Sequence, residues 1–184
     1  MEFQPSQYGP NIARLLSLSG NGERLLPLRR TLCVSDEARD VLRMMTPRDL
    51  FPKVEEPEAP MMGLFLYFAC YEEAHKLAEF CESHEGDLWH AILYRMEGDF
   101  GSAAHWFRQV GAHPVYDKLS REVGQITARF REAEFRGHLW DPFAFISFCE
   151  RARRQPGSVQ ERAAMEIQRV EWQVLFDYSS RYTD

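Results

Sequence analysis

The sequence predicts an all-α protein of about six to eight helices packed as antiparallel hairpins. Apolar residues recur every three or four positions along most of the 184-residue chain, which is the spacing of one face of an α-helix. Capping residues precede several of these stretches, and glycine or proline follows them, as at the two ends of a helix. No segment shows the alternation of β-branched and polar residues that indicates a half-buried strand.

The composition suits one globular core and argues against several classes of partner. Hydrophobic residues make up 45% and aromatic residues 13% of the chain, which is enough for a buried core. The net charge is −6 and the two signs are interleaved, so we expect no nucleic-acid partner. The longest apolar run, residues 61–70, is too short to span a bilayer, and the N-terminus lacks the pattern of a secretory signal. We therefore expect a cytoplasmic protein without membrane contact.

We expect two parts in the chain. Residues 1–60 are predicted to form an N-terminal arm with short helices, which packs on a helical main domain of residues 61–184. In the arm, one helix begins after Pro10, and a second follows the capping residue Ser35. Residues 52–60, PKVEEPEAP, contain three prolines and three glutamates, so this stretch is predicted to be an exposed connector.

A long helix is expected over residues 61–83. Its first half, MMGLFLYFAC, is apolar on all sides, which is typical of a helix buried in a core. Its second half, YEEAHKLAEFCES, is amphipathic. We interpret the segment as the central helix of the fold, with the arm lying on it. The alternative is that its apolar face forms the interface of a homodimer.

Residues 85–114, EGDLWHAILYRMEGDFGSAAHWFRQVGAHP, carry the clearest helix–turn–helix signal in the chain. We expect a first helix that is capped by Asp87 and runs to about Glu97, and a second over residues 102–110. The turn between them is predicted at Gly98 and Asp99, since glycine adopts the positive φ of a helix end and aspartate tolerates a turn.

Residues 84–117 resemble one tetratricopeptide (TPR) repeat, which is a pair of antiparallel helices in about 34 residues. The resemblance rests on the pattern Y-x3-GDF-x2-A-x3-F, formed by Tyr94, Gly98, Asp99, Phe100, Ala103 and Phe107. The chain departs from the repeat at Asp87, His90 and Val110, where the repeat prefers Trp, Leu and a small residue. No second clean copy occurs at this period, so no solenoid is expected. The wider string also looks like one from a bacterial protein family without an assigned activity. The resemblance implies a helical hairpin and favours a protein-binding role.

Three helices are expected in the C-terminal part. A long amphipathic helix starts at Val115 and ends near Gly137. A second is capped by Asp141, with proline at its first position. The last helix follows Ser158-x-x-Glu161, which is the pattern of a capping box.

Polar and aromatic side chains gather on the predicted hairpin. Six of them form the candidate binding site: His90, Tyr94, Glu97, His105, Trp106 and Arg108. The first three share one stripe of the first helix, and the last three are neighbours on the second. In the functional interpretation, the carboxylate orients a histidine base and the arginine holds an anion. In the structural interpretation, the histidine and the tyrosine are buried and bond to local partners. An exposed Trp106 beside Arg108 is typical of a binding hot spot.

We expect no metal or cofactor, although two spacings are those of metal sites. Glu72-x-x-His75 and Asp87-x-x-His90 are similar to the carboxylate–histidine pairs of helical di-metal proteins, but the sequence shows no clear second pair of inward carboxylates. It also contains no nucleophile elbow, phosphate-binding loop, dinucleotide loop or zinc signature. The cysteines lack metal spacing, and we expect four free buried thiols in a reducing compartment: Cys33, Cys70, Cys81 and Cys149.

Two functions remain open. The first is a small helical interaction module or scaffold, which binds an unknown protein partner or a second copy of itself. The missing catalytic motifs favour it. The second is a small-molecule-binding protein or enzyme that uses a polar pocket of His90, Glu97, His105 and Arg108. A flat apolar patch around Trp106 would favour the first function, and polar side chains converging in a concave pocket would favour the second.

Overall fold

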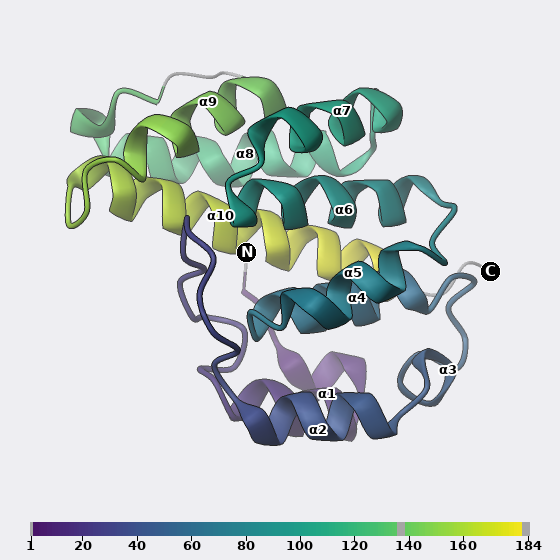
Figure 1. Ribbon diagram of the computed structural model, residues 1–184. Coiled ribbons are helices and arrows are strands. Elements are labelled where there is room, and N and C mark those ends of the chain that lie inside the picture. The colour runs from purple at the N-terminus through teal and green to yellow at the C-terminus, as the bar shows by residue number, and fades with distance from the viewer. Residues whose placement is uncertain (1, 136–138, 182–184) are drawn as a thin grey trace.

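The computed structural model describes residues 2–135 and 139–181, and it confirms the all-α prediction. The described residues form ten α-helices and no strand (Figure 1). The α-helices are α1 Pro10–Ser17, α2 Asp36–Met44, α3 Pro47–Leu50, α4 Glu58–Tyr67, α5 Tyr71–Ala78, α6 His84–Glu97, α7 Phe100–Val110, α8 Val115–Arg129, α9 Pro142–Ala152 and α10 Val159–Ser179. Two short 3-10 helices, Pro5–Tyr8 and Arg131–Ala133, precede α1 and follow α8.

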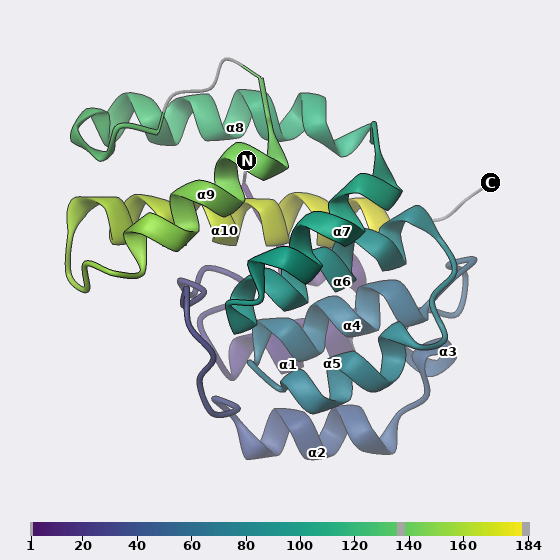
Figure 2. The ribbon, with the colours of Figure 1, turned by 45° about the horizontal axis from the view of Figure 1, so that its top comes forward.

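Helix α10 crosses the middle of the molecule. Helices α8 and α9 pack on one side of it, and α4 packs on another (Figures 1 and 2). Helix α6 pairs with α7 and also packs on α4 and α5, while α7 reaches α9. Helices α1 and α2 lie at the end of the molecule away from α8 and α9 (Figure 1). Nowhere in the described ranges does a helix combine the length and the apolar character that crossing a membrane requires.

Helix α4 is the most enclosed element, as its apolar sequence predicts. Every residue of α4 after Glu58 is buried, because α5, α6 and α10 all pack against it. The apolar residues 61–70 therefore lie inside the chain's own core, and the dimer-interface alternative for this stretch is wrong. Gly63 lets the helices approach closely, since a Cβ placed there would lie 2.7 Å from the Trp89 ring. The carbonyl oxygen of Gly63 also accepts a 2.7 Å hydrogen bond from Trp172 Nε1.

The prediction of one helix over residues 61–83 is wrong. The chain reverses at residues 68–70, so that α4 and α5 are two helices packed against each other. Ala69 makes this reversal possible with a φ of 59°, a conformation that non-glycine residues seldom adopt. The first half of the stretch is apolar on all sides and the second half is amphipathic, and this difference explains the break. An all-apolar helix must enter the core, whereas the amphipathic half must keep one face at the surface.

The prediction of an exposed connector over residues 52–60 is also wrong in part. Pro57, Ala59 and Pro60 are buried, and α4 begins within the stretch. The Glu56 carboxylate accepts hydrogen bonds from the backbone N–H groups of Glu82 and Ser83, at 2.8 and 3.2 Å, and from the Ser83 hydroxyl. The stretch is ordered because its glutamate satisfies polar groups at the start of α6.

Several helix ends differ from the predicted ones. Helix α6 is capped by Ser83, whose Oγ accepts from Gly86 N at 3.0 Å, four residues before the expected cap Asp87. Helix α7 is capped by Asp99, which accepts from Ser102 N at 3.0 Å. The turn itself is confirmed, since Gly98 has a φ of 89°.

The C-terminal helices follow the prediction with two changes. Helix α8 ends at Arg129 rather than near Gly137, and Gly137 lies outside the described residues. The Asp141 cap of α9 is confirmed, since its carboxylate accepts from two backbone N–H groups of the first turn. Ser158 caps α10 by accepting from Glu161 N at 3.1 Å. The Glu161 carboxylate accepts from Gly157 N instead of Ser158 N. The second hydrogen bond of the predicted capping box is therefore replaced by one to the preceding residue.

The N-terminal arm is held on α4 and α10 by buried polar side chains. Tyr67 Oη accepts from Gly22 N at 3.0 Å and donates to the carbonyl oxygen of Ser19. Gln173 Nε2 donates to the carbonyl oxygen of Gly22 at 2.9 Å. Gln168 Nε2 donates to that of Pro27 at 3.0 Å. These bonds satisfy backbone groups in a segment that has no regular secondary structure of its own.

The prediction of four free thiols is wrong, because Cys33 and Cys70 form a disulfide with their Cα atoms 4.7 Å apart. Cys81 and Cys149 are free. The pairing arises where the arm runs past the α4–α5 reversal, and there Val34 N donates to the carbonyl oxygen of Phe68 at 2.8 Å. The two cysteines are 37 residues apart in sequence, so only the path of the folded chain brings them together.

Candidate functional site

Four rings from three helices form one cluster at the surface. We call His75 of α5, His90 and Tyr94 of α6, and Trp106 of α7 the histidine–aromatic cluster. The His90 ring stacks on Trp106 with centroids 4.1 Å apart and on Tyr94 with centroids 4.9 Å apart. The His75 ring lies edge-on to both α6 rings, 5.3 Å from Tyr94 and 6.1 Å from His90. All four side chains are half-buried, so part of the cluster faces solvent.

The local sequence explains this arrangement. His90 and Tyr94 are one turn apart on α6, which places their rings on the same side of the helix. Ala103 and Phe107, two of the three buried residues of α7, face α6 and turn Trp106 toward the His90 ring. Three of the four rings were expected from the sequence. His75 was not, because only the reversal after α4 brings α5 alongside α6.

His90 is uncharged at neutral pH. Burial of the ring, and to a smaller degree the charge of His75, lowers the pKa of His90 to about 4. A general base works best when its pKa lies near the working pH. The functional interpretation of His90 as a base at neutral pH is therefore weak on physical grounds, and the ring is better suited to stacking.

Glu97 marks one end of the cluster. Its Oε2 lies 2.8 Å from His75 Nε2, and its Oε1 accepts from the Arg30 guanidinium at 2.9 Å. The same guanidinium pairs with Glu72 and lies over the Tyr71 ring, 5.5 Å from its centroid. We call Glu72 and Glu97 the acidic edge. Arg30 belongs to the N-terminal arm, so no local pattern could have assigned it to this place.

His105 and Arg108 lie at the margin of the cluster. His105 is exposed and meets the Trp106 ring edge-on at 5.7 Å. Arg108 is also exposed, and its guanidinium lies over Phe143 of α9 at 5.9 Å. Arg108 thus lies over a ring of another helix, while Glu97 is bound to Arg30 and His75.

The carboxylate–histidine spacings do not form a metal site in the described part of the chain. There, no three side chains of His, Cys, Asp or Glu come together as a metal site requires. Glu72 pairs with Arg30 and His75 with Glu97. Asp87 lies at the other end of the same α6 stripe, where burial raises its pKa.

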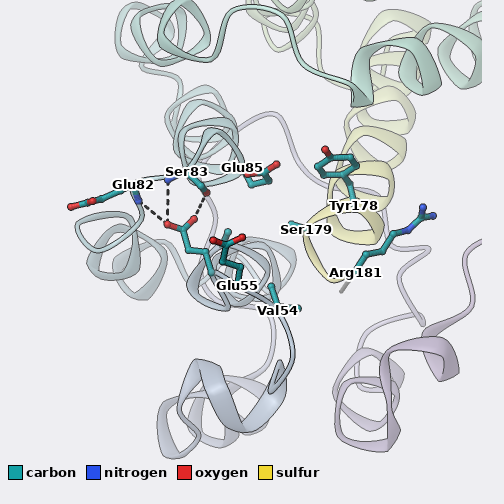
Figure 3. A pocket seen from close by; sticks show the side chains of 10 residues that line it. Val54, Glu55, Glu82, Ser83, Glu85, Tyr178, Ser179 and Arg181 are labelled. Carbon is teal, nitrogen blue, oxygen red and sulfur yellow. Dashed lines mark hydrogen bonds between the residues drawn. The ribbon is translucent and has the colours of Figure 1, made fainter. Parts of the chain in front are cut away.

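A separate cavity of about 660 Å³ opens between the start of α6, the end of α10 and residues 54–59. Figure 3 shows Glu85 and Tyr178 on two sides of this hollow, with Glu55 and Val54 below them. Its lining is Val54, Glu55, Glu56, Ala59, Glu82, Ser83, Glu85, Tyr178, Ser179 and Arg181. Sequence analysis missed the cavity, because its walls come from three distant segments that carry no shared motif.

The cavity is acidic, and some of its charges are already bound. Glu56 accepts from the residues before α6. Glu85 Oε1 lies 3.3 Å from His113 Nε2, and this hydrogen bond lowers the pKa of Glu85. Arg181 donates to Asp177 at 2.6 Å. Glu55 and Glu82 are exposed at the rim. A second cavity, of about 460 Å³, lies beside the first 3-10 helix and the residues around α3. No residue of the sequence-predicted site lines either cavity.

Comparison with known proteins yields no match to a family model, a curated protein or a solved structure.

Proposed function

We propose that this chain is a helical protein-interaction module whose recognition surface is the histidine–aromatic cluster. The observation that carries the proposal is the stack of His90 on both Tyr94 and Trp106, half-open to solvent on adjacent helices. Stacked rings lose little side-chain entropy when a partner covers them, and Trp and Tyr are the residues most enriched at binding hot spots. An uncharged His90 also avoids the cost of burying a charge under the partner.

The acidic edge defines the chemistry of the partner in this proposal. The chain's own Arg30 already shows how a guanidinium sits there, over the Tyr71 ring and between Glu72 and Glu97. Carboxylates and an aromatic face together favour arginine, which forms paired hydrogen bonds and stacks on rings. The partner is thus a protein segment that presents an arginine side chain beside an apolar one. The apolar side chain covers Trp106.

The resemblance of the α6–α7 hairpin to a TPR repeat agrees with a protein-binding role and is part of the proposal. The proposal also includes a cytoplasmic location, which was expected from the sequence. A second copy of this chain is an alternative partner, because it presents exposed arginines such as Arg108 on its own surface. A light-scattering mass of the purified protein distinguishes the monomer from such a dimer.

Selection from a random peptide library on the immobilised protein tests the proposal. We expect the selected peptides to be rich in arginine and to bind the Trp106→Ala variant at least tenfold more weakly, which is about 1.4 kcal/mol. Arg121→Ala removes an exposed arginine of α8, a helix that packs on α10, and serves as the control, with unchanged affinity. Peptides that bind all three proteins equally, or that are acidic, would refute the assignment of this surface.

The cavity at the end of α10 supports a second candidate function, the binding of a small organic cation. Its volume is within the range of small-molecule sites. Four glutamates and one tyrosine line it, against a single arginine that is already paired. Spermidine should raise the melting temperature of the wild-type protein and have a much smaller effect on a Glu55→Gln/Glu82→Gln double variant. Citrate is the anionic control. An equal effect of spermidine on both proteins would exclude the cavity as its site.

A further inference from the structure

Residues 28–34 lie across the surface of α5 and α6 as an irregular segment with few anchors. Leu28 is buried at one end, whereas the Leu32 side chain is 90% exposed and Val34 44% exposed. Between these points the segment is held by Arg30 on the acidic edge, by the Cys33–Cys70 disulfide and by the Val34 N–Phe68 O hydrogen bond. Two polar contacts at the surface add to these anchors: Arg29 donates to the carbonyl oxygen of Arg153, and Thr31 bonds to Tyr71. With so little buried apolar surface, its position depends on those anchors.

The disulfide lies close in sequence to the residues of the ion pair with the acidic edge, both on the arm and on the main body. On the arm, Arg30 and Cys33 are three residues apart, a span of at most about 10 Å. On the main body, Cys70 directly precedes Tyr71 and Glu72, the first residues of α5. The covalent bond therefore keeps Arg30 at a high local concentration beside Glu72 and Glu97.

The ion pairs alone hold the segment weakly. The Arg30 side chain is 50% exposed and that of Glu72 is 72% exposed. Exposed pairs of this kind contribute little, because water screens the charges and two long side chains lose freedom. Glu97 is only 12% exposed, but it keeps His75 as a second partner when Arg30 leaves.

From these contacts, we propose that the Cys33–Cys70 disulfide is a redox-controlled latch. When the bond is closed, it holds Arg30 on the acidic edge as an internal occupant. When the bond is reduced, residues 29–34 leave the surface, and Glu72 and Glu97 become available to an arginine from another protein. The release of the segment is independent of the proposed function, and only the identity of the new occupant rests on it.

The chemistry requires a dithiol reductant, of the thioredoxin class in a cell or dithiothreitol in the laboratory. Its thiolate attacks Sγ of Cys33, because the residue Cys33 is half-exposed while Cys70 is 2% exposed. The Cys33–Cys70 bond breaks, a mixed disulfide forms at Cys33, and Cys70 leaves as a thiolate that takes up a proton. The second thiol of the reductant then attacks the mixed disulfide and releases Cys33. Two electrons and two protons pass to the protein, and the reductant leaves as its own disulfide.

Limited proteolysis measures the latch directly. Trypsin cleaves after arginine, but only where several residues around the bond are free to enter its active site. We expect cleavage after Arg30 to become at least tenfold faster when the protein is reduced, and to be equally fast in Cys33→Ser without reductant. Cleavage after Arg131, on the exposed 3-10 helix that follows α8, is the internal control and should not change. Mass spectrometry identifies both cut sites.

Binding of a peptide measures whether the edge is uncovered. The probe is a fluorescent peptide of residues 27–34 with Cys33→Ser, and its control carries Arg30→Gln in addition. We expect the probe to bind reduced protein and the Cys33→Ser protein at least tenfold more tightly than oxidised protein. The control peptide should bind weakly to all three.

The two measurements separate the latch from the proposed function. Equal cleavage after Arg30 in oxidised and reduced protein refutes the latch, whatever the peptide does. Faster cleavage on reduction without peptide binding supports the latch and refutes recognition of arginine at the acidic edge. The Cys33→Ser protein and reduced wild type reach the open state by different routes, so a folding defect in one does not obscure the result.

Discussion

Arg95 of α6 and Glu171 of α10 form an ion pair in the centre of the protein, with side chains that are 0% and 3% exposed. Arg95 NH1 donates to Glu171 Oε1 at 3.0 Å, NH2 donates to Oε2, and Nε donates to Gln168 Oε1 at 3.3 Å. Burial by itself lowers the pKa of Arg95, but the charge and hydrogen bonds of Glu171 outweigh it and raise the pKa. This ion pair attaches the α6–α7 hairpin to α10, and the hairpin carries three rings of the histidine–aromatic cluster.

Glu171→Gln should destabilise the protein by about 3–5 kcal/mol, because it leaves a buried guanidinium without its counter-charge. Urea unfolding at pH 7 measures the loss. A double variant, Arg95→Met/Glu171→Met, removes both charges and should be more stable than Glu171→Gln alone. A loss below about 1 kcal/mol in the single variant would mean that water reaches the pair.

Gly98→Val should destabilise the protein by about 1–2 kcal/mol or more, since Gly98 has a φ of 89°. The added side chain would also displace the Arg153 guanidinium, which lies against this glycine. Thermal unfolding is the measurement. Gly124→Ala is the matched control, because Gly124 lies inside α8 with no atom within 4 Å of a Cβ placed there. That control should gain about 0.5–1 kcal/mol from helix propensity.

His90 should make the stability of the protein depend on pH. Its pKa is about 4 in the folded protein and about 6.5 in an unfolded chain, so the unfolded state binds a proton at higher pH. Its contribution is present above pH 6.5 and is lost as the pH falls toward 4. Because the ring is only partly buried, we expect the loss to be about 1–2 kcal/mol. His90→Phe keeps a ring in the stack and removes the titration, so its unfolding free energy should fall less between pH 7 and pH 4.5. Parallel curves for the two proteins would contradict a lowered pKa.

Gly63→Ala should destabilise the protein by about 1–3 kcal/mol through overpacking. The new methyl group would lie 2.7 Å from the Trp89 ring, which is itself fully buried and has little room to move. Urea unfolding measures the effect, and Trp fluorescence reports on the displaced ring. A fully stable variant would show that α4 can shift away from α6.

The helices could be predicted because most of them bury one face, and burial on one face imposes a spacing of three or four on the sequence. The reversal at Ala69 could not be predicted, because no glycine or proline marks it. Residues 52–60 were expected to be exposed because of their composition. The composition of a segment does not reveal that one of its carboxylates caps another helix. Glu56 does this for the residues before α6.

The candidate site could be predicted only as far as one hairpin reaches. The ring stack of His90, Tyr94 and Trp106 follows from spacing on two adjacent helices. His75, Arg30 and the Cys33–Cys70 disulfide belong to the site through contacts between residues far apart in the chain. No local pattern reports such contacts, because they arise from the path of the whole chain.

The two buried glutamines of α10 also determine the order in which this chain can fold during synthesis. Gln168 and Gln173 bond to Pro27 and Gly22, which leave the ribosome about 140–150 residues earlier. Until α10 emerges, the arm has its contacts with α4 but lacks those with α10. Contacts of such long separation form slowly. The N-terminal segment therefore completes its contacts only after the last helix has been made, and a chaperone that shields apolar segments should raise the yield of folded protein.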